Sequence, residues 1–149
     1  VWEPACGDGA ISKVLEANGL DVVSTDLYDR GYGKGGMNFM TSDCTCGSII
    51  TNPPFNLAAQ FIERAAEKEV PFAMLLKATY WHAAKRNDLF NRTRPLAVMA
   101  MSWRPAMSPE RGKSGTMDFI WTVWRSKPVN LSRYHVCSKP SLPYKQGVI

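Results

Sequence analysis

Long apolar runs are missing from this sequence, and none approaches the ~20 residues that a membrane-spanning helix needs. A signal-peptide pattern is missing as well. We therefore expect no membrane partner. The chain has 149 residues, of which 45% are hydrophobic, and this predicts a single globular domain over residues 1–149 with one core. A strand already starts at Val1, so we expect the N-terminus to be trimmed.

Cysteine and histidine are scarce, with four and two residues respectively. Only one residue separates Cys44 from Cys46, which is too close for the usual zinc spacing, and His82 and His135 are isolated. We therefore expect no metal site. The cysteines are predicted to be free thiols, as in a cytoplasmic protein.

Acidic residues are outnumbered, with 13 Asp and Glu against 18 Lys and Arg, so the net charge is +5. Such an excess favours an anionic partner, and nucleic acid first. Many soluble proteins are mildly basic, however, and charge alone leaves an ordinary solvated surface equally open.

The N-terminal residues have the pattern of a strand, a glycine turn and a helix. Residues 1–4 end a strand, residues 5–9 (Ala-Cys-Gly-Asp-Gly) form the turn, and residues 10–18 form a helix that stops at Gly19. Glycines let a ligand approach the backbone, and the N–H groups at a helix start face that ligand. Ser12 stands where the dinucleotide fingerprint has its third glycine, so a dinucleotide is disfavoured.

A second strand is predicted over residues 20–25, and Asp26 closes it. A carboxylate at this place can accept hydrogen bonds from both hydroxyls of a ribose. The alternatives are a turn or helix-cap role for Asp26, or Asp29 as the ribose ligand. Residues 30–36 are rich in glycine and predict a flexible surface loop, and residues 37–40 predict a short third strand.

The chain is organised around residues 49–55, where an apolar strand end runs into Asn52-Pro53-Pro54-Phe55. The two prolines stop the strand and hold the residues before them extended. The side-chain oxygen of Asn52 and the backbone oxygen of Pro53 are thus two rigid acceptors. Two such acceptors suit a planar NH2 group, and the ring of Phe55 suits a stacked base.

This tetrapeptide resembles the Asn-Pro-Pro-Phe/Tyr motif of class I S-adenosylmethionine-dependent amino-methyltransferases, above all the adenine-N6 DNA enzymes of phages and bacteria. Residues 3–9 (Glu-Pro-Ala-Cys-Gly-Asp-Gly) resemble motif I of the same family. The resemblance extends from Val1 to about Arg125. It implies an α/β, Rossmann-like fold, with a seven-stranded, mostly parallel sheet, an antiparallel last strand and helices on both faces. It also implies S-adenosylmethionine as the cofactor and adenine N6 in DNA as the methyl acceptor, in a bacterial or phage-infected cell.

The resemblance also assigns residues to roles. The catalytic set is Asn52, Pro53, Pro54 and Phe55. The cofactor-binding set is Glu3, Pro4, Ala5, Cys6, Gly7, Gly9, Asp26, Leu27, Asn38, Phe39 and Asn52. Where the family commonly has an acid and an aromatic residue that read the adenine of the cofactor, this chain has Asn38-Phe39. Asp43 is the alternative reader if the register is shifted.

The remaining residues complete the predicted sheet. Helices are expected at 57–69, with Ala58, Phe61, Ile62, Ala65 and Ala66 on its core face, and at 83–91; strands are expected at 72–76, 96–102 and 117–124. The last two strands are predicted to be antiparallel because no helix separates them. Residues 126–149 are predicted to form a tail packed over the domain. Candidate nucleic-acid ligands are Lys77, Trp103, Arg104, Arg111 and Lys113, while the Lys85, Arg86 and Arg92 cluster is more typical of a solvated face.

The predicted reaction is direct methyl transfer to an amino nitrogen. Three alternatives stay open at this point. RNA adenine methylation uses similar residues, and protein glutamine-N5 methylation uses a similar tetrapeptide. A non-catalytic nucleic-acid-binding module that kept the fold is the third.

Overall fold

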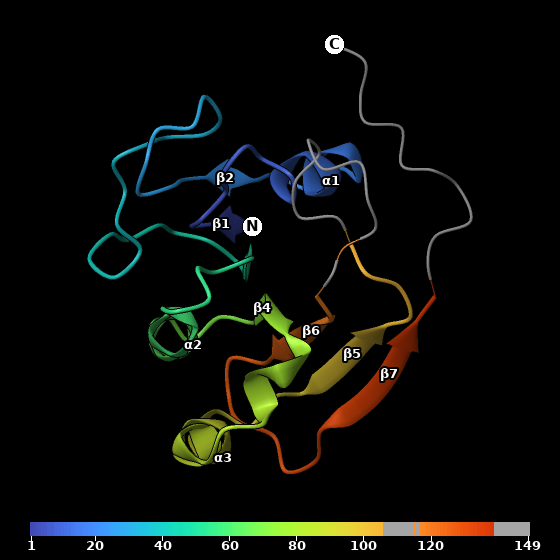
Figure 1. Cartoon of the computed structure of the whole chain (residues 1–149). Helices are drawn as coiled ribbons and strands as arrows, with labels where there is room; N and C mark the ends of the chain where they lie inside the picture. The colour runs from blue at the N-terminus through green and yellow to red at the C-terminus, as the bar shows by residue number, and fades with distance from the viewer. Residues whose placement is uncertain (106–114, 116, 139–149) are drawn as a thin grey trace.

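The computed structural model describes residues 1–105, 115 and 117–138. Its strands form one seven-stranded sheet in the order β2-β1-β3-β4-β6-β5-β7 (Figure 1). The strands are β1 (Trp2–Glu3), β2 (Val23–Ser24), β3 (Ile49–Thr51), β4 (Phe72–Lys77), β5 (Ala97–Met101), β6 (Phe119–Trp124) and β7 (Arg133–Cys137). Apolar runs at β3, β4 and β6 explain why these three lie in the middle of the sheet.

Strand direction divides the sheet into two parts. The neighbours β2, β1, β3 and β4 are all parallel. By contrast, β6 is antiparallel both to β4 and to β5. The predicted antiparallel arrangement of the strands at 96–102 and 117–124 is thus confirmed. The parallel part places the carboxyl ends of β1, β2 and β3 at one edge.

Helices lie on both faces of the sheet, as predicted. They are α1 (Ser12–Ala17), α2 (Ala58–Glu67) and α3 (Asn87–Thr93), with two short 3-10 turns, η1 (Ala78–Trp81) and η2 (Ala84–Arg86). Figure 1 shows α1 on one side of the sheet and α2 with α3 on the other. In the described part of the chain, no helix combines the length and the apolar character needed to cross a membrane.

The core lies between the sheet and α2. Ala58, Phe61, Ile62 and Ala65 of α2 are buried, as the 3.6-residue period predicts, and Ala66 packs against them. Opposite them, Phe72 of β4 stacks on Trp124 of β6 with ring centroids 4.6 Å apart. These aromatic contacts fix β4 and β6 together in the centre of the sheet.

The predicted third strand at residues 37–40 is wrong. These residues form a turn, in which the Asn38 side-chain oxygen accepts the N–H of Met40 at 3.0 Å. Such a local bond competes with pairing to a neighbouring strand. The place beside β2 is taken instead by Lys34 of the glycine-rich loop, which forms a parallel bridge with Thr25. Residues 30–36 form a mostly exposed loop, in keeping with the predicted surface loop, and this bridge connects it to the sheet edge.

The predicted tail is wrong over part of its length. Residues 133–137 do not lie over the domain but form β7, which adds a parallel edge strand beside β5. The strand at 117–124 is consequently not the last in the chain. Four of the five β7 residues are exposed, and an exposed edge strand shows little of the apolar pattern that predicts strands. Residues 139–149 lie outside the described residues.

Candidate active site

A cavity of about 730 Å³ opens where the parallel strands β1, β2 and β3 end. The segments that leave these strands supply its walls, because carboxyl ends of parallel neighbours meet at one edge. Its lining includes all four residues of the predicted catalytic set. It also includes Glu3, Pro4, Ala5, Cys6, Gly7, Asp26, Leu27, Asn38 and Phe39 of the predicted cofactor set. Gly9 is the one predicted member absent from the lining.

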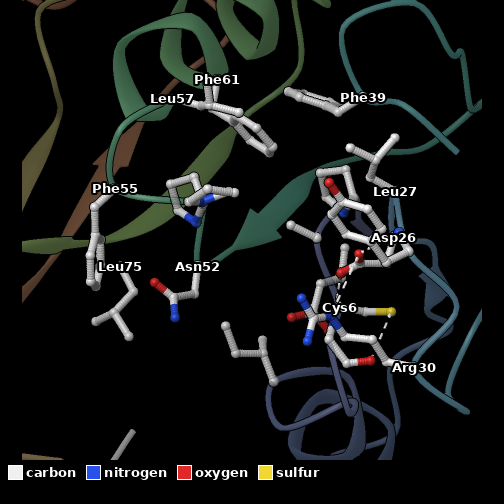
Figure 2. Close-up of a pocket in the computed structure, with 18 of the residues that line it drawn as sticks. Cys6, Asp26, Leu27, Arg30, Phe39, Asn52, Phe55, Leu57, Phe61 and Leu75 are labelled. Atoms are coloured by element: carbon white, nitrogen blue, oxygen red, sulfur yellow. Dashed lines mark hydrogen bonds and ion pairs between the residues drawn. The ribbon is translucent and has the colours of Figure 1, made fainter. Parts of the chain in front are cut away.

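Asn52 lies between the two ends of this cavity (Figure 2). Its side-chain oxygen is buried and has no hydrogen-bond partner among the described residues. Leaving such an acceptor unpaired costs about 1–3 kcal/mol, which a protein normally avoids. The adjacent Pro53 is fully buried, so the backbone that carries Asn52 is held firmly. The site therefore presents a rigid acceptor that an incoming N–H group can satisfy.

Phe55 stands at one end of the cavity and is 37% exposed, which is high for a large apolar side chain. Its ring lies beside Phe119 with centroids 5.9 Å apart, and the Lys77 ammonium lies 4.2 Å from its centroid. A partly exposed ring held in this way can stack on a flat ligand.

Asp26 and the glycine turn meet at the opposite end. The Gly7 N–H donates to Oδ2 of Asp26 and the Tyr28 N–H donates to Oδ1, both at 2.9 Å. Arg30 adds a cation, with its Nε 4.0 Å from Oδ1. Each carboxylate oxygen has room for a further donor, because it offers two lone pairs. The fixed carboxylate can therefore accept hydrogen bonds from a diol.

Glu3 is 1% exposed, and one serine, Ser12, holds its carboxylate. The Ser12 hydroxyl donates to the Glu3 carboxylate and lies 2.6 Å from the Ser24 hydroxyl. Ser12 thus has a specific role at the position where a dinucleotide site would need glycine. Burial raises the pKa of Glu3 to about 7, although the Ser12 hydrogen bond works in the opposite direction.

The raised pKa of Glu3 predicts a pH-dependent stability. Between about pH 4.5 and 7 the folded protein holds a proton that the unfolded chain releases, so this contribution is complete below pH 4.5 and lost as the pH rises through 7. We expect the free energy of unfolding to fall by up to about 3 kcal/mol over this range. Urea unfolding of the wild type and of Glu3→Gln over this pH range measures the fall in the free energy of unfolding. Glu3→Gln should remove most of the fall and the exposed Glu69→Gln should not; equal slopes in all three proteins would contradict the assignment.

Gly9 packs against the ring of Tyr32 instead of facing the cavity. It has a φ of +83°, and a Cβ there would lie 2.4 Å from the ring. Gly9→Ala should therefore lose about 2 kcal/mol of unfolding free energy, from backbone strain and from the clash. Gly19→Ala is the matched control, because φ is +80° and nothing lies within 4 Å. If thermal unfolding shows that both variants lose the same unfolding free energy, the contact with Tyr32 does not contribute to the effect of Gly9→Ala.

Of the residues predicted to contact the adenine of the cofactor, Asn38 and Phe39 lie at the cavity and Asp43 does not. Asn38 lines the cavity, with its side-chain oxygen engaged in the turn, and Phe39 forms part of the wall. Phe39 is also a core residue, packed on Trp2 and Phe61 with centroids 5.1 and 4.8 Å away. Asp43 lies elsewhere and forms ion pairs with Arg64 and Lys68. The alternative that Asp43 replaces Asn38 is therefore not supported.

The structure describes three of the five predicted nucleic-acid ligands, Lys77, Trp103 and Arg104. Lys77 contacts Phe55 at the site, whereas Arg104 pairs with Asp118 at 2.7 Å. Trp103 is half-buried and, like Arg104, is absent from the described cavity lining. Arg111 and Lys113 lie outside the described residues.

Sequence reasoning missed several residues of the cavity wall. Arg30 comes from the glycine-rich loop, Leu75 from the middle of β4, and Met117 from the segment before β6. Only for Arg30 did the sequence hold a clue to its place at the cavity, since it is a cation four residues after Asp26. Leu75 and Met117 are apolar residues whose place depends on how distant strands pair.

Cys6 lines this cavity. Burial, together with the nearby Glu3 and Asp26 carboxylates, raises the pKa of the Cys6 thiol to about 11, so it stays protonated at neutral pH. All four cysteines are free. Within residues 1–105, 115 and 117–138, no three His, Cys, Asp or Glu side chains gather as a metal site would require.

Comparison with solved structures identifies the fold. A candidate RNA methyltransferase from Pyrococcus horikoshii matches with a TM-score of 0.57 and 14% identity, over 87% of this chain and 73% of its own. A candidate class I S-adenosylmethionine-dependent methyltransferase from Listeria monocytogenes matches with a TM-score of 0.55 and 10% identity, over 92% of this chain and 57% of its own. The modification subunit of a candidate type I restriction enzyme from Vibrio vulnificus matches with a TM-score of 0.56 and 12% identity, over 94% of this chain and 43% of its own.

This is the class I methyltransferase fold. No protein-family model and no curated protein matches the sequence. The chain spans about half the length of the second and third of these structures. Identities of 10–14% relate folds and carry no residue roles, so the chemistry of this methyltransferase fold has to be argued from its own cavity.

Proposed function

We propose that this protein is an S-adenosylmethionine-dependent methyltransferase that acts on the N6 amino group of adenine in DNA. The observation that carries the proposal is the buried, unpartnered side-chain oxygen of Asn52 in a cavity shared with Asp26. An amino group can satisfy this acceptor, because it donates N–H hydrogen bonds.

The cavity offers groups that suit the proposed cofactor. Asp26 has lone pairs for the ribose hydroxyls, and Gly7 exposes backbone to the cavity without a side chain in the way. Glu3 lies where the cationic amino group of the amino-acid part would lower its pKa again. S-adenosylmethionine, when bound, supplies a methyl group activated by a sulfonium centre.

The protein's own contribution is positioning. Asn52 and the Pro53 backbone oxygen accept hydrogen bonds from the target amino group and hold its nitrogen in one direction. Phe55 stacks on the base, whose extrusion costs a few kcal/mol. Most of the acceleration would come from this fixed geometry, because the reacting atoms are held close and aligned.

Transfer of label from methyl-labelled S-adenosylmethionine tests the proposal. Single- and double-stranded DNA, RNA and a protein extract serve as acceptors. Label in DNA supports it, and label confined to RNA moves the substrate to the RNA alternative. Label confined to the protein fraction favours glutamine-N5 transfer, and failure to bind S-adenosylmethionine in calorimetry favours a non-catalytic module.

A further inference from the structure

A second, smaller cavity of about 240 Å³ adjoins the first, and Phe55 and Asn56 line both. Its other polar lining residues are Lys77, Thr79, Tyr80 and Arg86. Two of these are cations and none is an acid. The composition of the wall therefore suits an anion that accepts hydrogen bonds.

The structure separates the three cations that the sequence places together. Arg92 pairs with Asp88 at 2.7 Å and with Glu63 at 2.9 Å, and Lys85 is exposed. Arg86 instead turns inward: its guanidinium lies 3.9 Å from the ring centroid of Tyr80 and donates to the backbone oxygen of that residue. The prediction of a solvated face is thus right for Lys85 and wrong for Arg86.

The charges of this second cavity are not neutralised within the described residues. No described carboxylate forms an ion pair with Lys77 or Arg86 there. The ammonium of Lys77 contacts the Phe55 ring and the guanidinium of Arg86 contacts the Tyr80 ring, so both heads are fixed without an anion. Two unneutralised cations beside one small cavity attract an anionic group strongly.

Tyr80 supplies an independent sign of a missing ligand. The residue is 7% exposed, and its buried hydroxyl has no hydrogen-bond partner in the part of the chain that the structure describes. Burial raises its pKa, so the hydroxyl remains a donor at neutral pH. An unpaired buried hydroxyl is costly unless something else in the working protein pairs with it.

We propose that this second cavity holds a backbone phosphate next to the target nucleotide, with Lys77, Arg86 and the Tyr80 hydroxyl as its ligands. The inference rests on the proposed function, and it deepens it: the substrate is a nucleic acid rather than a protein glutamine. The shared wall at Phe55 explains the arrangement, since a base stacked on that ring has its own phosphate within reach of the next cavity. A phosphodiester offers only acceptors, and these three groups offer donors.

Binding of a short fluorescein-labelled DNA with one adenine, as a single strand and as a duplex, tests the site by anisotropy over a range of salt. Arg86→Gln should weaken binding about tenfold and reduce the single-strand salt slope by about 0.7. Lys85→Gln removes the same charge one residue away, on an exposed side chain, and should change the affinity less than about twofold. Tyr80→Phe keeps the packing and should also weaken binding, even if Arg86→Gln folds poorly.

A neutral methylphosphonate on the 5′ or 3′ side of the adenine locates the contact. At one of the two positions it should weaken wild-type binding about tenfold and leave Arg86→Gln nearly unaffected. The inference is overturned if Tyr80→Phe binds like the wild type and folded Arg86→Gln binds like Lys85→Gln, or if the wild type ignores both methylphosphonates. If DNA is nevertheless methylated, only this site is lost; if only protein is methylated, the proposed function has failed.

Discussion

Replacing Asn52 by alanine is expected to lower the rate of methyl transfer about a thousandfold while changing the affinity for S-adenosylmethionine little. The side-chain oxygen of Asn52 is the buried acceptor that the amino group would satisfy, so its loss removes both orientation and electrostatic stabilisation. Because that oxygen is unpaired in the free protein, we also expect the free energy of unfolding to rise by about 1 kcal/mol. Transfer rates at saturating substrate, calorimetry and urea unfolding measure the three effects.

Thr51→Val is the matched control for this variant. The Thr51 hydroxyl is likewise buried and without a partner in residues 1–105, 115 and 117–138, but Thr51 is not among the residues that line the cavity. Its removal should stabilise the fold in the same direction and leave transfer intact. Asn52→Ala that transfers methyl groups at the wild-type rate, or that loses cofactor binding as its main defect, would contradict the role given to Asn52.

Replacing Asp26 by alanine is expected to weaken binding of S-adenosylmethionine about a hundredfold. The variant loses two charged acceptors for the ribose, and it also releases the Gly7 N–H that Asp26 holds at 2.9 Å. Calorimetry with the cofactor alone measures the effect, without any need to know the methyl acceptor.

Asp29→Ala serves as the control, because Asp29 was the other candidate for the ribose. Its carboxylate accepts the Gly31 N–H at 2.9 Å on an exposed turn, and it does not line the cavity. We expect less than about a threefold change in affinity. An unchanged dissociation constant for Asp26→Ala would remove Asp26 from the ribose site.

The part of the site that could be predicted from the sequence consists of residues that directly follow strands. Glu3, Asp26 and Asn52 each lie at or just after the end of a parallel strand, and the structure gathers them around one cavity. Periodicity locates these strands, and the geometry of parallel sheets then brings their ends together. Long-range contacts were not needed for this step.

Local competition explains the strand that was predicted wrongly at residues 37–40. The segment Met37-Asn38-Phe39-Met40 is mostly apolar, as a short strand can be, but the Asn38 side chain closes a turn on Met40. The glycines at 31, 33 and 36, all with positive φ, let Lys34 reach β2 instead. A pattern of apolar residues cannot show which of two short segments pairs with the sheet edge beside β2.

The packing of elements against one another explains the features that sequence reasoning missed. Met117 reaches the first cavity and Arg86 turns toward Tyr80 only because β4, η1 and η2 pack as they do. In the sequence, Arg86 stands between a lysine and a polar helix start and resembles any surface cation. Its inward orientation is a property of the packed structure alone.

Mass spectrometry of nucleosides tests the central claim most directly. DNA is incubated with S-adenosylmethionine and the wild-type protein or Asn52→Ala, then digested and compared with untreated DNA. We predict N6-methyladenine with the wild type and almost none with the variant. N4-methylcytosine in its place, or unmodified DNA beside a methylated protein fraction, would contradict the account.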